Sequence, residues 1–298
     1  MSTAIFLDGN WLLHRAESAI GSYTEFPNKK IPLLILNWFC DYAIRFRAEF
    51  GAICFDGGQN FRYGVYSGYK ASRSVSSAEQ RVSSGEGKSK SDNTYAALQP
   101  CLSLFSMIGL ASYQHPNYEA DDLVAAGSWH FSKVDKTRKG IIICRDKDSL
   151  SQVSERVVVW TPEMSGQPEI TWTEKEVRAK YGLSPRQFRD YQVLIGDKID
   201  DIPGVLPPAK AKQLLLRYNS IKAYLTTPEG KAFFTEHGSE LMRNKQLVSM
   251  ARDCWAPNDS ELRIKLSTAN DSDILNSYGP LPKSAAALRS FLTKPRLF

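Results

Sequence analysis

The sequence has few of the side chains on which zinc centres and disulfide frameworks are built. Among its 298 residues there are only 4 histidines and 5 cysteines. No two cysteines have C-x-x-C spacing, and their number is odd. Cys54 and Cys144 lie in apolar, strand-like runs and are expected to be buried free thiols. The pattern therefore argues against a zinc ribbon and against a disulfide-linked fold.

Long apolar runs are also missing. No segment approaches the roughly 18 uncharged apolar residues of a membrane span. The longest candidate, residues 32–50, is interrupted by charged residues from Asp41 to Glu49. No secretory signal precedes the first apolar run, which ends at Asp8. We therefore expect a soluble protein of the cytoplasm, with no membrane partner.

Short apolar runs alternate with helical patterns in the first part of the chain. The runs predict strands at residues 3–7, 52–55, 140–144 and 157–160. Strands that alternate with helices favour an α/β fold with a mostly parallel central sheet covered by helices. From residue 173 the sequence looks entirely helical, with capping-box patterns that begin at Thr173 and Ser184. We predict an α/β core over residues 1–172 and a helical region over residues 173–298.

Residues 67–94 differ in composition from the rest. Ser, Gly, Lys and Arg dominate there, which is typical of a segment that orders only conditionally. Helices are expected before it, at residues 31–50, and after it, at residues 93–108. The tail from residue 280 to residue 298 is expected on the surface.

Acidic residues closely follow three of the expected strands: Asp8, Asp56 and Asp146. The carboxyl ends of parallel strands are where ligands bind in such sheets. Further acids stand at the ends of other elements; these are Glu119, Asp121, Asp122, Asp148, Asp197 and Asp200. Taken alone, the acids at 119–122 fit a first helical turn and those at 197–201 fit a turn between helices.

Taken together, the acids predict a metal site. So many carboxylates cannot converge without cations, and oxygen ligands without His or Cys suit Mg²⁺ or Mn²⁺. Two or more such ions can activate a water and stabilise the leaving oxygen of a phosphodiester. A net charge of +6 around a local acidic site suits a polyanionic substrate.

The short motifs also occur in a specific order. They are F-L-D-G at residues 6–9, L-H-R-A at 13–16, F-D at 55–56, Y-K-A-S-R at 69–73, Y-E-A-D-D at 118–122, D-K-D at 146–148 and I-G-D-K-I-D-D-I-P-G-V at 195–205. Over residues 4 to about 220 the chain resembles the 5′ nucleases, namely phage flap endonucleases and the 5′–3′ exonuclease domain of bacterial DNA polymerase I. The resemblance implies a PIN-like core and a helix-turn-helix-like DNA-binding motif in the helical region.

The resemblance also implies roles for individual residues. One metal cluster would use Asp8, Asp56, Glu119, Asp121 and Asp146, and a second would use Asp146, Asp148, Asp197 and Asp200. Asp122 would support these metal ligands from behind. Lys70 and Arg73 would grip the scissile phosphate, and Tyr69 would either stack on a base or simply pack. Residues 67–94 would form an arch over a 5′ single strand, with Arg81, Lys88 and Lys90 near its phosphates.

The sequence departs from the family after the P-G-V motif. Family members carry a glycine-rich hairpin there, which offers amides to duplex phosphate and helps to hold K⁺. Here Leu206, Pro207 and Pro208 follow, and proline has no N–H. A K⁺ site is therefore in question, whereas Lys210 and Lys212 remain available to the duplex. Asp201 stands where Asn is common; it would either add a carboxylate or serve as a turn residue, and we favour the turn interpretation.

The sequence thus predicts a metal-dependent 5′ nuclease that cuts branched or 5′-ended DNA, with RNA–DNA hybrid as a further partner, and that acts as a monomer in replication or repair. Two alternatives remain. One is a catalytically weak, DNA-binding replication accessory protein on the same fold, although no metal-site acid is missing. The other is a PIN-like ribonuclease, which usually has fewer acids and lacks the G-D-x-x-D turn.

Overall fold

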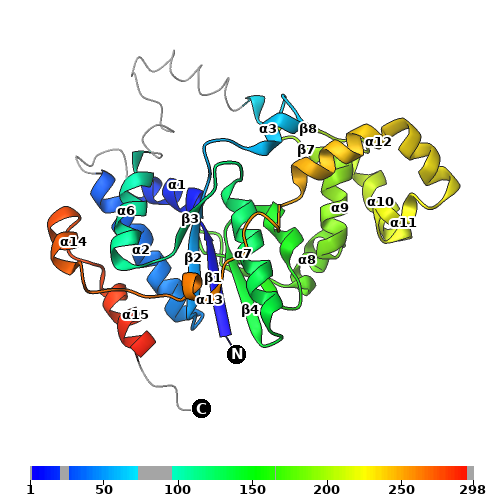
Figure 1. Ribbon diagram of the computed structural model, residues 1–298. Helices are drawn as coiled ribbons and strands as arrows, with labels where there is room; N and C mark the ends of the chain where they lie inside the picture. The colour runs from blue at the N-terminus through cyan, green and yellow to red at the C-terminus, as the bar shows by residue number, and fades with distance from the viewer. Residues whose placement is uncertain (1, 21–26, 73–95, 165, 294–298) are drawn as a thin grey trace.

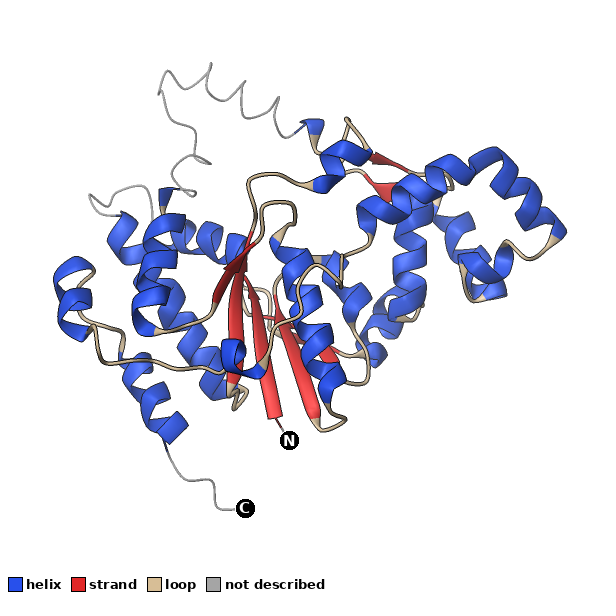
Figure 2. Cartoon of the chain, viewed as in Figure 1, coloured by secondary structure: helices blue, strands red, loops and turns tan. Residues whose placement is uncertain are grey.

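A six-stranded sheet forms the centre of the protein (Figure 2). The computed structural model describes residues 2–20, 27–72, 96–164 and 166–293. The spatial order of the strands is β3-β2-β1-β4-β5-β6, with the first five parallel and β6 antiparallel to β5. The strands are β1 (Ser2–Asp8), β2 (Phe50–Phe55), β3 (Ser112–Gln114), β4 (Arg138–Ile143), β5 (Val157–Thr161) and β6 (Ile170–Trp172).

Helices surround this sheet and extend away from it at one side (Figure 1). Those of the first half are α1 (Gly9–Ile20), α2 (Pro27–Arg45), α3 (Phe61–Val65), α6 (Leu98–Ile108), α7 (Ala120–Val134) and the 3-10 helix η1 (Lys147–Gln152). Those of the second half are α8 (Glu174–Tyr181), α9 (Pro185–Ile195), α10 (Pro208–Tyr218), α11 (Ile221–Tyr224), α12 (Pro228–Val248), α13 (Asp259–Leu262), α14 (Asp271–Ser277) and α15 (Lys283–Thr293). Among the described residues, every helix is too short or too polar to span a bilayer.

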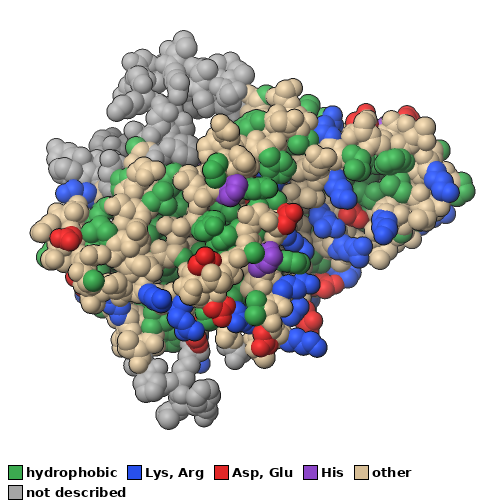
Figure 3. Space-filling view, in the orientation of Figure 1, with side chains coloured by type: hydrophobic (Ala, Val, Ile, Leu, Met, Phe, Trp, Pro, Cys, Tyr) green, Lys and Arg blue, Asp and Glu red, His purple; other side chains and the backbone are tan. Residues whose placement is uncertain are grey.

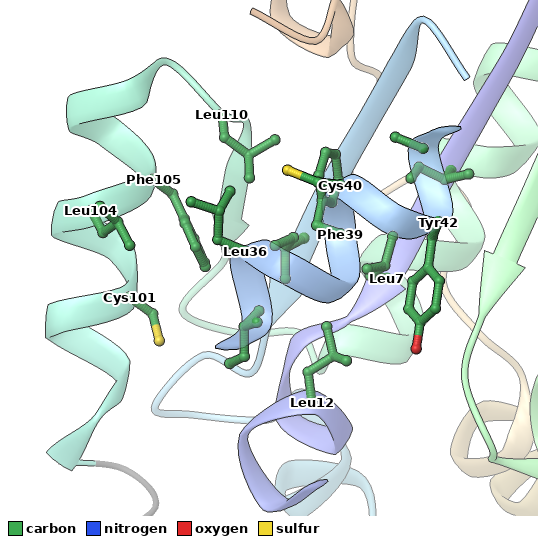
Figure 4. Packing of buried hydrophobic residues seen from close by; sticks show 14 of the residues in the cluster. Leu7, Leu12, Leu36, Phe39, Cys40, Tyr42, Cys101, Leu104, Phe105 and Leu110 are labelled. Carbon is green, nitrogen blue, oxygen red and sulfur yellow. The ribbon is translucent and has the colours of Figure 1, made fainter. Parts of the chain in front are cut away.

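Both faces of the sheet are buried, as the apolar runs predicted. Successive side chains of a strand point to opposite faces. Ile5 and Leu7 of β1 therefore pack with α1, α2 and α6, in the cluster drawn in Figure 4. Ala4 and Phe6 pack on the other face, with α7. Cys54 and Cys144 are buried free thiols, which confirms that prediction.

The predicted mostly parallel sheet is confirmed, with two strands that the sequence analysis missed. β3 and β6 have three residues each, too few for a recognisable apolar pattern. The helix predicted for residues 31–50 ends earlier, at Arg45, because Arg47 adopts φ +50° in the turn that leads into β2. β2 begins at Phe50, two residues before the start of the strand expected at residues 52–55.

The predicted caps at the start of the helical region are present. Thr173 and Glu176 form a capping box on α8, and Ser184 and Gln187 form one on α9. Between α9 and α10 the chain forms a two-stranded hairpin, β7 (Gly196–Asp197) and β8 (Ile202–Pro203). This hairpin requires glycine at Gly204, because a Cβ there would lie 2.2 Å from the carbonyl oxygen of Ile195.

The chain after α12 returns to the α/β core. Trp255 and Leu262 join the cluster on the α7 face, and Leu288 of α15 is 0% exposed against the α2 face. α15 thus lies at the surface, as expected for the tail from residue 280, but it also packs one face on the core through Ala285 and Leu288. Residues 174–248 form the extended helical part seen at the right of Figure 1.

Candidate active site

Three neighbouring parallel strands bring acids to one edge of the sheet. β1 lies between β2 and β4, with Asp8 beside Cys54 of β2 and Leu7 beside Ile143 of β4. Asp8 is the last residue of β1, Asp56 follows β2 directly, and Asp146 caps the 3-10 helix after β4. The sequence prediction for these three acids depended on this strand arrangement.

A cavity of about 420 Å³ lies over this edge. Its other acids come from three further segments: the start of α7, η1 and the β7–β8 hairpin. The acids that line it are Asp8, Asp56, Glu119, Asp121, Asp146, Asp148, Asp197 and Asp200. Eight of the nine predicted metal ligands are therefore brought together, and Asp122 is the exception.

Several of these carboxylates are fixed by hydrogen bonds. One Asp56 oxygen accepts the Ala120 N–H at 2.8 Å, and the other accepts the Asn10 side-chain amide at 2.5 Å. Asp8 accepts the Trp11 N–H at 3.1 Å, so this carboxylate also begins α1. Asp148 accepts the side-chain amide of Gln192, which lies on α9. The hydrogen bonds orient the acids before any ligand arrives.

Burial raises the pKa of most of these carboxyls, because it disfavours their charged form. The pKa of Asp56 rises from 3.8 to about 6, with burial as the main cause. The pKa values of Asp8, Asp121 and Asp148 are raised by burial and then by neighbouring carboxylates. Glu119 differs: burial opposes ionisation, yet Lys70 and Arg62 lower its pKa below the usual value.

The donor set fits divalent cations that prefer oxygen. Asp121 Oδ1 is buried without a hydrogen-bond partner, an acceptor that only a cation or a water could satisfy. As the side chains lie, no three His, Cys, Asp or Glu groups in the described residues are arranged to hold one ion directly. Lysines neutralise part of the charge instead: Lys70 contacts Glu119, and Lys147 lies 3.0 Å from Asp197. Mg²⁺ retains several waters, so this spacing is compatible with contacts through water.

Tyr69 and Lys70 both face Glu119. The Tyr69 hydroxyl donates to Glu119 at 3.1 Å, and its ring is 2% exposed. This burial favours the packing interpretation of Tyr69 over base stacking. Lys70 adopts φ +54°, and its N–H donates to the carbonyl oxygen of Asp200 at 3.0 Å. Its ammonium group therefore lies inside the cavity.

Asp122 does not line the cavity. It is 0% exposed, and Arg62 holds its two oxygens at 2.6 and 2.8 Å. Arg62 also donates to the carbonyl oxygens of Leu247 and Ser249, at 2.7 and 3.2 Å. Through Arg62, Asp122 thus connects α7 to α3 and to the end of α12. This position behind the cavity is the one that the resemblance implies for it.

The sequence analysis missed Arg62, Asn10 and Gln192. Asn10 makes two hydrogen bonds with Asp56: its side-chain amide donates to the carboxylate, and its side-chain oxygen accepts the Asp56 N–H. Arg62 lies in the five-residue helix α3, which carries no periodic signal. Its partner is 60 positions away, so nothing in the local sequence could have indicated the ion pair.

The remaining predicted contacts lie elsewhere. Arg73, Arg81, Lys88 and Lys90, with most of the predicted arch, fall outside the described residues. Lys210 and Lys212 are both exposed on α10, outside the cavity lining. Asp201 adopts φ +57° and accepts the N–H and hydroxyl of Ser72, in agreement with its interpretation as a turn residue.

The amides of the P-G-V turn are already used within the protein. The N–H groups of Val205 and Leu206 both donate to the carbonyl oxygen of Leu194, at 2.8 and 3.0 Å. Pro207 and Pro208 then start α10 and have no N–H to offer. This hairpin therefore presents fewer free amides to a phosphate than a glycine-rich one would.

A parallel sheet whose carboxyl edge collects eight acids beside a lysine defines the class of metal-assisted phosphodiester hydrolases. Residues 3–182 match the family described as "5′-3′ exonuclease, N-terminal resolvase-like domain". Because this match covers more than half of the chain, the protein belongs to that family.

Relatives of similar and of greater length match the chain. It is 27% identical to the 5′-3′ exonuclease of Aquifex aeolicus over 279 residues, or 91% of this chain and 89% of that protein. It is 29% identical to the thermostable DNA polymerase I of Thermus aquaticus over 304 residues. That match covers 95% of this chain and 34% of the polymerase.

Solved structures share the fold. The D15 protein of bacteriophage T5, crystallised with metal ions, has a TM-score of 0.68 at 14% identity, over 97% of this chain and 99% of that one. The T5 D15 flap endonuclease in a complex with DNA and metal ions has a TM-score of 0.67 at 14% identity, over 98% and 100%. Human GEN1 bound to Holliday junction DNA has a TM-score of 0.57 at 13% identity, over 97% and 71%.

Proposed function

We propose that the protein is a structure-specific 5′ nuclease that hydrolyses DNA phosphodiesters near 5′ ends and branch points. The observation that carries the proposal is the convergence of eight carboxylates from six segments in one cavity with Lys70 and Arg62. Branched or 5′-ended DNA is the proposed substrate, RNA–DNA hybrid a further one, and the monomer the proposed active form. Mg²⁺ or Mn²⁺ are the proposed cofactors.

The proposed chemistry is a direct displacement at phosphorus. Divalent cations would neutralise the acids and supply an activated water. Lys70 would leave Glu119 to contact a nonbridging phosphate oxygen, where its charge offsets the charge that develops as water attacks. Asp56 and Asp8 are already oriented by Asn10 and Trp11, so they need little rearrangement. The products would be a 5′-phosphate and a 3′-hydroxyl, with no covalent enzyme intermediate.

The helical part would hold the duplex beside the cavity. The β7–β8 hairpin carries Asp197 and Asp200 and leads directly into α10. Because Pro207 and Pro208 leave the start of α10 without their own N–H donors, the phosphate contacts would come mainly from Lys210 and Lys212, which lie in its first turns. We propose that this end of α10 contacts duplex phosphates, without the K⁺ site of glycine-rich relatives.

Cleavage of a 5′-labelled flap substrate tests the function. We would measure it with Mg²⁺, with Mn²⁺ and with EDTA, for the unchanged protein and for Asp146→Ala. A matched control is Asp273→Ala, because Asp273 is an exposed acid of α14 outside the cavity. We expect metal-dependent cutting near the junction that Asp146→Ala abolishes and Asp273→Ala preserves.

Other outcomes would favour the other functions. Tight binding of the flap without cutting under any metal condition would overturn the nuclease proposal and favour a DNA-binding accessory protein. Preferential cutting of single-stranded RNA in the same assay would favour a PIN-like ribonuclease.

A further inference from the structure

A second polar cavity, of about 320 Å³, shares no lining residue with the carboxylate cavity. It lies between the end of α7, the loop from η1 to β5, and the segment after α12. Its lining contains three cations from these three segments, Lys133, Arg156 and Arg252. Among the described residues that line it, Glu155 is the one acid, and its side chain is exposed.

Arg252 is held in this cavity by neutral groups. Its Nε donates to Gln152 Oε1 at 2.8 Å, and its carbonyl oxygen accepts from His130 Nε2 at 3.0 Å. Gln152 is itself only 5% exposed, so the guanidinium is fixed against the core. Burial, and then the nearby Arg189, lower the pKa of Arg252, because both disfavour its charged form.

The other two cations also lack an acidic partner. In the described part of the chain, no carboxylate lies within 4.0 Å of the charged nitrogens of Lys133, Arg156 or Arg252. The carboxyl end of α7 accounts for a cation at Lys133. It does not account for Arg156 and Arg252, which come from other segments. Three cations from three segments therefore face one cavity without a carboxylate within ion-pair distance, which favours an anion as its ligand.

We propose that this cavity binds a phosphate group. Two guanidinium groups and an ammonium provide charge-assisted donors for a phosphate, and Arg suits its geometry in particular. Ser154 Oγ already accepts the N–H groups of Arg156 and Val157, so its hydroxyl hydrogen is left to donate to the ligand. The ring of Trp129, 5.1 Å from the Lys133 ammonium, borders the site.

The position of the cavity separates it from the catalytic centre. Arg156 precedes β5, and Lys133 precedes β4, whereas Asp146 follows β4. The phosphate site therefore lies toward the amino ends of these parallel strands, and the acids lie at their carboxyl ends. Figure 3 shows Lys and Arg side chains gathered over the lower and right parts of the molecule in that view. The phosphate could belong to a free nucleotide or to the backbone of a nucleic acid, since the recognising chemistry is the same.

Two binding measurements distinguish these sources, both in EDTA so that no cleavage occurs. The first is calorimetric titration with inorganic phosphate and with a 5′-mononucleotide. The second is the salt dependence of binding to a labelled duplex, in which each lost phosphate contact lowers the slope of log K against log salt by about 0.9. The variants are Arg156→Gln and Arg252→Gln. The Arg156 side chain makes no hydrogen bond or ion pair with the described residues, so Arg156→Gln should fold normally. Arg263→Gln, outside the cavity, is the control.

Either of two results would support the proposal. Phosphate affinity that falls about tenfold or more in both variants, but not in the control, would assign the site to a free phosphate ligand. A duplex slope that falls by about 0.9 per variant, without phosphate binding, would assign it to the nucleic-acid backbone. Variants that match the control in both measurements would overturn the proposal. Flap cleavage by the unchanged protein and by Arg263→Gln is measured separately with Mg²⁺, so a failure of this proposal is distinguished from a failure of the proposed nuclease function.

Discussion

Replacement of Arg62 by methionine should destabilise the protein far more than the loss of an ordinary surface charge. Arg62 is 4% exposed and Asp122 is 0% exposed, so the substitution leaves a buried carboxylate without its counterion. Removal of one partner of such a pair costs about 3–5 kcal/mol. The whole free energy of unfolding of a domain is about 5–15 kcal/mol. Arg62→Met should therefore lose a large share of the stability.

Urea unfolding followed by circular dichroism measures this change. With an m-value of about 3 kcal/mol per molar urea, the midpoint should fall by about 1 M or more. Arg178→Met is the matched control, because Arg178 forms an exposed pair with Glu174, in which both side chains are about half exposed. An exposed pair of this kind contributes only about 0.3–0.5 kcal/mol.

A double variant keeps the test informative if Arg62→Met fails to fold. Arg62→Met combined with Asp122→Leu removes both charges, and it should recover much of the lost stability. The reasoning would be refuted if Arg62→Met cost no more than Arg178→Met. It would also be refuted if the two substitutions at the buried pair destabilised the protein additively.

Three further predictions concern the carboxylate cavity. In EDTA, the free energy of unfolding should fall as the pH rises from about 4 to 6. Burial raises the pKa of Asp56 to about 6 in the folded state, so over this range the folded state keeps a proton that the unfolded state has already released. Saturating Mg²⁺ should flatten this profile in calorimetric unfolding, and an unchanged profile would contradict the metal site. Lys70→Ala should lower the single-turnover cleavage rate about a hundredfold, with little change in DNA affinity in EDTA; equal losses in both would assign Lys70 to binding alone. Gly204→Ala should destabilise the protein by about 1–3 kcal/mol, because its Cβ would meet the Ile195 carbonyl oxygen, whereas Gly64→Ala meets nothing within 4 Å. Similar melting temperatures for the two glycine variants would contradict this account.

The parts of the fold that follow from local sequence were predictable. Asp8, Asp56 and Asp146 each come after a buried strand, and parallel strands end at one edge, so their convergence follows from periodicity alone. The capping boxes at Thr173 and Ser184 were equally readable, because four neighbouring residues determine them.

The parts that depend on long-range packing were not predictable. The pairing of Arg62 with Asp122 spans 60 positions, and no local pattern distinguishes Arg62 from a surface arginine. The return of α15 to the core was missed for a similar reason. Its buried Leu288 and Ala285 stand in a short segment whose basic residues suggested solvent, whereas Arg289 is held by Asp271.

The β7–β8 hairpin couples the position of the helical part to the geometry of the carboxylate cavity. One short turn supplies Asp197 and Asp200 to the cavity, holds Lys70 through the carbonyl oxygen of Asp200, and continues into α10. A displacement of the helical part by about 1 Å would misplace both acids and the lysine at once, enough to slow catalysis about a hundredfold. We therefore expect cutting only when the helical part and the sheet are correctly aligned, and a DNA that engages one without the other should be bound but not cut.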